Sequence, residues 1–120
     1  MNILYIEDNA DLSYVFSTLL TTKIPTAKIS IATTGTGGLE LFKKGLQGTV
    51  DFFDVVIADV LLADTSGIKV LQDIIALSPT TAVLLLTAYA DESFVQKSGI
   101  EVFSKPNVLK LIERLTQLSL

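Results

Sequence analysis

The segment Val55-Val56-Ile57-Ala58-Asp59 places four consecutive apolar residues directly before a carboxylate. A short apolar run bounded by polar residues is typical of a strand buried on both faces of a sheet. Two other runs, Ile3–Ile6 and Val83–Leu86, have the same character. Lys28–Ala32, which alternates, and Ile100–Phe103 predict two weaker or edge strands. The chain therefore predicts five strands.

Amphipathic helices are predicted between these strands, because apolar residues recur there every three or four positions. The periodic sets are Leu12, Val15, Phe16, Leu19 and Leu20; Leu39, Phe42 and Leu46; Ile68, Leu71, Ile74 and Ile75; and Val108, Leu111, Ile112, Leu115 and Leu118. The segment from Asp91 to Lys97 predicts only a short, weak helix, since it has just Phe94 and Val95 to bury. Strand and helix thus alternate five times.

This alternation predicts an α/β fold with a parallel sheet, right-handed crossovers and helices on both faces. Five such units in 120 residues fit a flavodoxin-like doubly wound (βα)5 fold, for which the expected strand order is 2-1-3-4-5. We expect residues 1–120 to form a single domain, because 49% of them are hydrophobic and only 18% are charged.

The composition excludes several classes of function. The chain has neither cysteine nor histidine, so zinc–thiolate sites, cysteine nucleophiles, Ser-His-Asp triads and a phosphohistidine of its own are excluded. A net charge of −4 disfavours direct nucleic-acid binding, and Lys43-Lys44 fits a solvated helix edge. We expect a cytoplasmic protein that is not in a membrane, because no basic signal-peptide region precedes the first apolar run and no run approaches the roughly 20 residues of a membrane span.

Polar side chains follow four of the five predicted strands. Glu7-Asp8 follows the first, Asp59 the third, Thr87 the fourth and Lys105-Pro106 the fifth. Each of these residues alone is an ordinary cap, turn or surface residue. Because ligand sites of doubly wound folds lie beyond the carboxyl ends of the strands, we expect these side chains to share one site.

The residue types in this set suit phosphoryl chemistry. Three carboxylates held close together repel one another, and a hard divalent cation such as Mg²⁺ relieves the repulsion. Asp59 can then attack phosphorus as a nucleophile and form an acyl phosphate. Thr87 can donate a hydrogen bond to a phosphoryl oxygen, and Lys105 can supply positive charge to another.

These motifs resemble the receiver domain of bacterial response regulators in two-component signalling, such as the chemotaxis regulators, over the whole chain. The similar segments are Ile3–Asn9, with its acidic pair; Val55–Asp59, with Gly67 eight residues after Asp59; Leu86-Thr87-Ala88; and Ser104-Lys105-Pro106. The resemblance implies that Asp59 is the phosphoacceptor. It implies Mg²⁺ or Mn²⁺ as cofactor, with Asp8 and Asp59 as direct ligands, the backbone carbonyl of Leu61 as a further ligand, and Glu7 acting through water.

The resemblance also implies a signalling switch and not an enzyme, promoting only its own aspartyl phosphorylation and dephosphorylation. The implied partners are a sensor histidine kinase or phosphotransfer protein, and a downstream protein or an output domain outside this chain. A dimer through the face formed by the fourth helix, fifth strand and fifth helix is also implied.

Several positions depart from the family pattern. Ala63 stands where a proline is usual, which predicts a less rigid loop, and Val102 stands at the usual aromatic switch position, followed by Phe103. Leu61 and Tyr89 occupy positions that commonly carry polar side chains, so we expect them to shield the acyl phosphate from water. By resemblance, the Lys105–Pro106 bond is expected to be cis.

Four alternative interpretations remain to be weighed. Thr34–Gly38 resembles a phosphate-binding loop but lacks the full motif, so a loop leading into the second helix is the better interpretation. A flavin carrier is disfavoured because the loop after the first strand is acidic, and a phosphatase because Leu61, not an aspartate, stands two residues after Asp59. A receiver fold that binds partners without phosphorylation is the main alternative, and Val102 mildly favours it.

Overall fold

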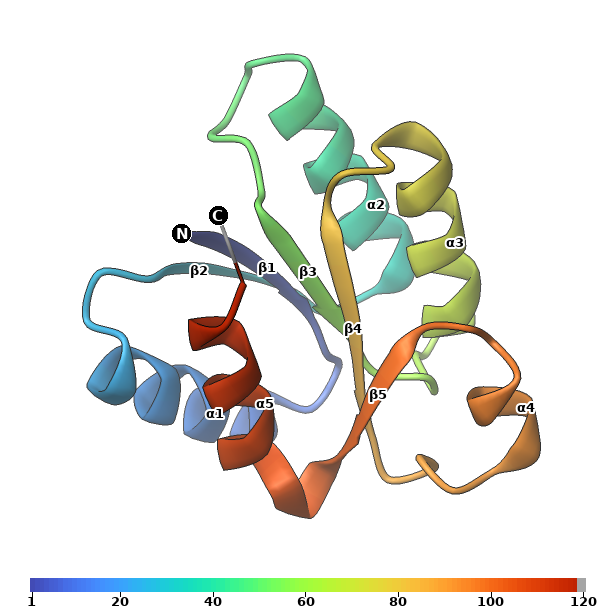
Figure 1. Ribbon diagram of the computed structural model, residues 1–120. Helices are drawn as coiled ribbons and strands as arrows, with labels where there is room; N and C mark the ends of the chain where they lie inside the picture. The colour runs from blue at the N-terminus through green and yellow to red at the C-terminus, as the bar shows by residue number, and fades with distance from the viewer. Residues whose placement is uncertain (119–120) are drawn as a thin grey trace.

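The computed structural model describes residues 1–118 and shows a five-stranded parallel sheet with the strand order β2-β1-β3-β4-β5 (Figure 1). The elements are β1 (Asn2–Ile6), α1 (Ala10–Lys23), β2 (Lys28–Ala32), α2 (Gly35–Leu46), β3 (Val55–Ala58), α3 (Gly67–Leu77), β4 (Ala82–Thr87), α4 (Ser93–Gln96), β5 (Glu101–Ser104), the 3-10 turn η1 (Lys105–Asn107) and α5 (Val108–Thr116). This confirms the predicted flavodoxin-like fold and its strand order.

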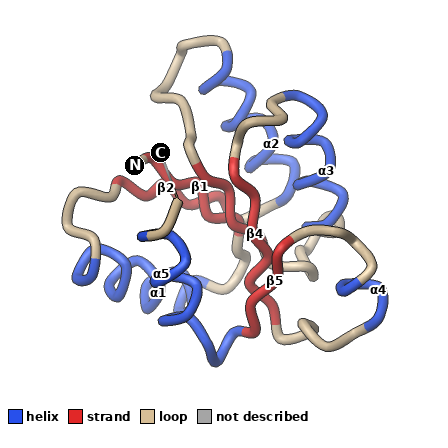
Figure 2. The backbone as a smooth tube through the Cα atoms, viewed as in Figure 1, coloured by secondary structure: helices blue, strands red, loops and turns tan. Residues whose placement is uncertain are grey.

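The helices cover the sheet in two layers (Figures 1 and 2), with α1 and α5 on one face and α2 and α3 on the other. Successive residues of a strand point to opposite faces. Leu4 and Ile6 of β1 therefore pack in the core on the α2–α3 side, while Ile3 and Tyr5 pack on the α1–α5 side. A sheet covered on both faces explains why its central strands are apolar throughout.

The helices α1, α2 and α3 begin at side chains that cap them. Asn9 accepts a hydrogen bond from the amide of Leu12 at the start of α1, and Thr34 accepts one from the amide of Gly37 at the start of α2. Because Thr34 caps α2, Gly35 already lies in the helix, so the expectation that Thr34–Gly38 is a loop is wrong.

The periodic pattern predicted the helices better than it predicted which of their residues are buried. In α1, Phe16 and Leu20 are buried, but Leu12 is 37% and Val15 is 50% exposed. In α5, the helix ends at Thr116, and Leu118 packs against the core from beyond its end. Within residues 1–118, no helix combines the length and the apolar character that crossing a bilayer requires.

Two local expectations about the last third of the chain are corrected. The fourth helix is confirmed but contains only Ser93–Gln96, of which Val95 alone is buried. Every peptide bond within residues 1–118 is trans, so the expected cis bond at Lys105–Pro106 is wrong. Pro106 lies in the first turn of η1, where the fixed φ of proline fits a helical start without a cis bond.

Candidate functional site

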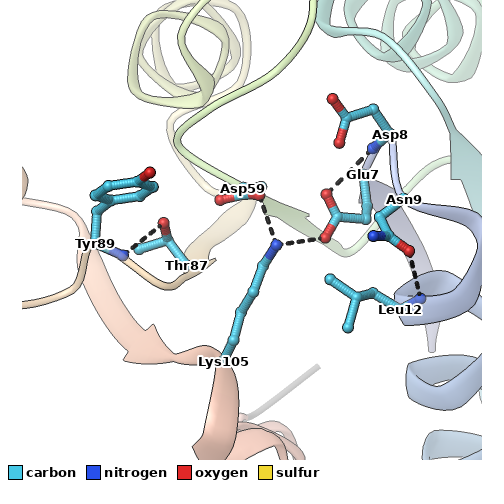
Figure 3. Close-up of polar contacts among 8 residues, drawn as sticks. All are labelled: Glu7, Asp8, Asn9, Leu12, Asp59, Thr87, Tyr89 and Lys105. Carbon is cyan, nitrogen blue, oxygen red and sulfur yellow. Dashed lines mark hydrogen bonds and ion pairs between the residues drawn. The ribbon is translucent and has the colours of Figure 1, made fainter.

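The site lies at the carboxyl ends of the central strands, where four polar residues from separate parts of the chain approach one another (Figure 3). Glu7 directly follows β1, Asp59 follows β3, Thr87 ends β4 and Lys105 follows β5. The amide of Asp59 donates to the carbonyl of Ile6 at 3.1 Å, so the sheet hydrogen bonding continues up to the functional residue. The sheet itself therefore fixes the backbone on which the site is built.

Lys105 joins the acidic residues of two strands. Its Nζ donates a hydrogen bond to Oδ2 of Asp59 at 2.8 Å and lies 2.8 Å from Oε1 of Glu7. The contact with Glu7 is an ion pair without hydrogen-bond alignment, because Oε1 has no hydrogen-bond partner within residues 1–118. The Glu7 side chain is fully buried, and that of Lys105 is 21% exposed. Two carboxylates thus share one ammonium group in a largely buried site.

Burial and charge shift the acid–base properties of these groups. Burial raises the pKa of the Glu7 carboxyl. The Lys105 ammonium lowers this pKa in part, and the negative charge of Asp59 raises it further. Burial alone would lower the pKa of Lys105, but its contacts with Asp59 and Glu7 outweigh this effect, so its pKa lies above the ordinary value. Burial, together with the charges of Glu7 and Asp59, also raises the pKa of Tyr5, whose phenol is therefore neutral. Because its pKa is raised, Lys105 is charged at neutral pH.

One oxygen of the Asp59 carboxylate has no partner among the described residues. Oδ2 is held by Lys105, whereas Oδ1 is buried and accepts no hydrogen bond within residues 1–118. Buried carboxylate oxygens are normally satisfied, so an unpartnered one indicates a role in binding or chemistry. This unpartnered oxygen could bind a cation, or it could form the bond to a phosphoryl group.

Asp8 does not join Glu7 and Asp59. Its side chain is exposed, its amide donates to Oε2 of Glu7 at 3.1 Å, and Figure 3 shows its carboxylate directed away from the Lys105 ammonium. Among residues 1–118, no three acidic, histidine or cysteine side chains are close enough together to hold a metal ion. The expected three-carboxylate cluster is therefore not assembled here, because Lys105 lies between the two buried acids and Asp8 points to solvent.

The chemistry of the donor set nevertheless fits a hard cation. Carboxylates and a backbone carbonyl are the ligands that Mg²⁺ prefers, and the unpartnered Oδ1 of Asp59 offers one of them. Asp8 would contribute by a side-chain rotation, which its exposure permits. The assignment of Asp8, Asp59, Glu7 and the Leu61 carbonyl as metal ligands stays a prediction.

Gly67 explains how α3 begins so close to Asp59. Its amide donates to the carbonyl of Val60 at 2.8 Å, and a Cβ atom at this position would lie 1.8 Å from the carbonyl oxygen of Asp59. Any larger residue would push the loop between β3 and α3 away from the site. The sequence showed this glycine as part of a family pattern, and the close approach gives its physical reason.

Thr87 is fully buried but does not contact Asp59 or Lys105 in Figure 3. Its Oγ1 accepts a hydrogen bond from the amide of Tyr89 at 3.2 Å, which leaves the hydroxyl proton available for donation. Tyr89 and Leu61, from neighbouring loops, are 42% and 52% exposed. The loops that follow β3 and β4 thus each expose a bulky side chain.

Two features near the site were missed by the sequence interpretation. Tyr5 was treated only as a strand residue, yet the charges of Glu7 and Asp59 act on its hydroxyl. Asp64 was given no role, yet its carboxylate binds the start of α2. The sequence did contain a signal for Tyr5. Tyr5 lies two positions before Glu7 along the strand, so both side chains point to the same face of the sheet. No local pattern indicated the contact of Asp64.

Comparison with known proteins agrees with this geometry. The sequence model of the response regulator receiver domain matches residues 3–116, so the chain belongs to the family of response regulator receiver domains. It is therefore a receiver domain of two-component signalling, a signalling module rather than a classical enzyme. No curated protein sequence matches the chain.

Solved structures share the fold at low sequence identity. The response regulator TrrA from Thermotoga maritima, solved in complex with Mg²⁺-BeF, has a TM-score of 0.81 and 24% identity, with 97% of this chain and 96% of that chain covered. A CheY-like receiver domain protein from Methanospirillum hungatei has a TM-score of 0.79 and 23% identity, covering 97% and 90%. The receiver domain of the hybrid histidine kinase CckA has a TM-score of 0.76 and 23% identity, covering 98% and 97%.

Proposed function

We propose that this receiver domain accepts a phosphoryl group on Asp59 from a histidine kinase or phosphotransfer protein and uses it as a conformational switch. The observation that carries the proposal is the state of the Asp59 carboxylate, with Oδ2 held by Lys105 and Oδ1 buried and unpartnered within residues 1–118. The chain has no histidine, so a phosphohistidine donor belongs to another protein or to another part of a longer one.

The reaction is a simple displacement at phosphorus. An Asp59 oxygen forms a new bond to phosphorus, the phosphorus–nitrogen bond of the donor phosphohistidine breaks, and its electron pair returns to the imidazole. Lys105 holds the Asp59 carboxylate in position before the reaction through its hydrogen bond to Oδ2. A cation such as Mg²⁺ or Mn²⁺, held by Asp8, Asp59 and the Leu61 carbonyl with Glu7 acting through water, would neutralise charge on the incoming phosphoryl group.

The switch follows from charge added at the strand ends. A phosphoryl group brings acceptor oxygens and negative charge, which attract the hydroxyl of Thr87 and the ammonium of Lys105. Thr87 would then turn its proton toward the phosphoryl group, and the loop at Tyr89 would move with it. The elements next in line are α4, β5 and α5, which we propose as the surface for a downstream partner or for a dimer.

The surface beside Lys105 suits a protein donor. Leu12 and Val15 on α1 are exposed, and Val108 at the start of α5 is half-buried. A pocket between these helices is lined by Leu12, Val15 and the Lys105 side chain. Exposed apolar side chains next to a functional group are typical of a docking surface. We propose that the phosphodonor protein docks here, so that its phosphohistidine reaches Asp59.

A small-molecule donor tests the phosphoacceptor directly. The protein is incubated with acetyl phosphate and Mg²⁺, and its intact mass is measured. The wild type should gain the mass of one phosphoryl group, and Asp59→Asn should gain none. Asp51→Asn is the matched control, because the same atoms change at an exposed residue outside the site, and it should gain the group as the wild type does.

The same experiment separates the main alternative. A wild type that gains no mass under these conditions would contradict the phosphoacceptor role and favour a receiver fold that binds partners without phosphorylation. Val102, at the usual aromatic switch position, bears only on the conformational change that follows phosphorylation. Val102 packs on the α2–α3 side of the sheet and Phe103 on the α1–α5 side, so neither replaces the other.

A further inference from the structure

The loop between β3 and α3 is joined to the start of α2 through a single carboxylate. Oδ1 of Asp64 accepts a hydrogen bond from the amide of Gly35 at 2.8 Å. Oδ2 accepts two more, from the amide of Thr36 at 2.9 Å and from its hydroxyl at 2.7 Å. Asp64 and this helix start are 28 to 29 residues apart in the sequence, so the contact belongs to the tertiary structure.

This contact is more than an ordinary helix cap. The helix α2 already has its own cap, because Oγ1 of Thr34 accepts a hydrogen bond from the amide of Gly37 at 3.0 Å. Asp64 binds the two amides before it, which a helix leaves without an internal partner. A negative charge at a helix N-terminus is also favoured by the helix dipole. The carboxylate is therefore well held although it is exposed.

The sequence of α2 is adapted to this contact. A Cβ atom on Gly35 would lie 2.4 Å from Cγ2 of Thr65 and 2.9 Å from Cγ2 of Val70. Glycine at this position lets the loop approach closely enough for Asp64 to reach the helix. The proposed function does not use the Thr34–Gly38 segment. The close approach of the loop gives a structural reason for the glycine at position 35.

The loop between β3 and α3 is held at its base and at its tip. At its base, the amide of Gly67 donates to the carbonyl of Val60 at 2.8 Å, directly after Asp59. Above the base, Leu61 and Ser66 form an isolated antiparallel bridge. Asp64 lies at the tip of the loop, next to Ala63. Ala63 stands where the family usually has a proline, whose ring would stiffen the loop. Fixing the tip to α2 restricts the segment in between, which carries Leu61.

We propose that Asp64 is a positioning residue of the phosphorylation site, which holds the loop against α2 and thereby keeps the Leu61 carbonyl in place beside Asp59. This inference rests on the proposed function, since the Leu61 carbonyl matters only if a cation binds there. Asp64 itself does not touch the phosphoryl group or the cation. It acts through the loop, in the role that the missing proline would otherwise have.

Three variants test this in the whole chain. Asp64→Ala removes the contact, Asp64→Asn keeps one acceptor oxygen, and Gly35→Ala displaces the loop without a change of charge. Asp73→Ala is the matched control, because it removes an exposed carboxylate that is bound to Lys69 on the surface of α3. Hydrogen exchange of the amides from residue 60 to 67 is measured without metal, and the Mg²⁺ dissociation constant is measured by calorimetry.

The two measurements should change together. Asp64→Ala should speed exchange in the loop and weaken Mg²⁺ binding roughly tenfold, the scale seen when residues that support metal ligands are removed. Gly35→Ala should produce both changes, Asp64→Asn smaller ones, and Asp73→Ala neither. Faster loop exchange with unchanged Mg²⁺ affinity would overturn the proposal, because Asp64 would then be a helix cap only, and so would the absence of both changes.

The wild type distinguishes this failure from a failure of the proposed function. If the wild type binds Mg²⁺ and takes up a phosphoryl group while Asp64→Ala behaves identically, the role of Asp64 alone is wrong. If the wild type neither binds Mg²⁺ nor takes up the group, the proposed function is wrong, and the role of Asp64 is wrong with it.

Discussion

Nζ of Lys105 lies 2.8 Å from Oδ2 of Asp59, although the two residues are 46 positions apart in the sequence. The same ammonium lies 2.8 Å from the buried carboxylate of Glu7. The protein therefore supplies its own counter-charge to the two acids when no cation is bound. A bound Mg²⁺ would share these acids with Lys105, which connects metal binding, stability and the reactivity of Asp59.

Removing this counter-charge should destabilise the metal-free protein. We expect Lys105→Met to lower the free energy of unfolding by about 3 kcal/mol, because Glu7 and Asp59 are then buried carboxylates without a compensating charge. Urea unfolding with and without Mg²⁺ measures this, and Mg²⁺ should stabilise the variant more than the wild type. Lys110→Met, at an exposed position, should change stability by no more than about 0.5 kcal/mol. Equal stability of Lys105→Met and the wild type without Mg²⁺ would refute the role of Lys105 as counter-charge.

The exposed leucine beside the site should control how long the phosphoryl group persists. We expect Leu61→Asn to lose it roughly tenfold faster, equivalent to about 1.4 kcal/mol of activation free energy, because an amide admits and orients water where leucine excludes it. The decay of the phosphorylated mass is followed after removal of acetyl phosphate. Leu77→Asn, at a leucine of similar exposure on α3, should decay at the wild-type rate. Slower loss from Leu61→Asn than from the parent would count against this shielding.

The contact of Asp64 should appear in the acid dependence of stability. The hydroxyl of Thr36, and then the amides of Thr36 and Gly35, lower the pKa of Asp64 from 3.8 to about 2. Between these values the unfolded chain binds more protons than the folded one, so this contribution is complete above a pH of about 4 and is lost as the pH falls toward 2. Asp64→Asn should therefore flatten the fall of unfolding free energy in this range.

A second variant refines the acid experiment. Thr36→Val removes the hydroxyl donor but keeps both backbone donors, so it should flatten the same slope only in part. Chemical unfolding at a series of pH values measures both variants. If Asp64→Asn retains the wild-type slope, the carboxylate is not held in solution as the structure has it.

The fourth helix should be the least protected helix among the described residues. It contains four residues and buries only Val95, and its N-cap Glu92 makes no side-chain capping bond within the described chain. Native-state hydrogen exchange should show the amides of Ser93–Gln96 exchanging far faster than those of β3, whose residues are all buried. Equal protection of the two segments would argue against α4 as a mobile part of the switch.

Local patterns in the sequence predicted the fold and the location of the site. Apolar runs such as Val55–Ala58 and periodic stripes such as that of α5 depend only on neighbouring residues, and they predicted the order of strands and helices correctly. A parallel sheet brings the carboxyl ends of its strands to one edge, so the order of the elements was enough to place Glu7, Asp59 and Lys105 together. The trans bond at Lys105–Pro106 was missed, because it depends on the 3-10 turn that follows β5.

By itself, then, the sequence determined a doubly wound receiver fold and the residue types at its strand ends, since burial and helical periodicity are read from nearby residues. Only the tertiary structure decided that Lys105 lies between Glu7 and Asp59, that Asp8 points to solvent, and that Asp64 reaches the first turn of α2. These contacts join residues far apart in the chain. They depend on side-chain rotamers and on how closely a loop can approach a helix, and no local pattern of residues encodes either.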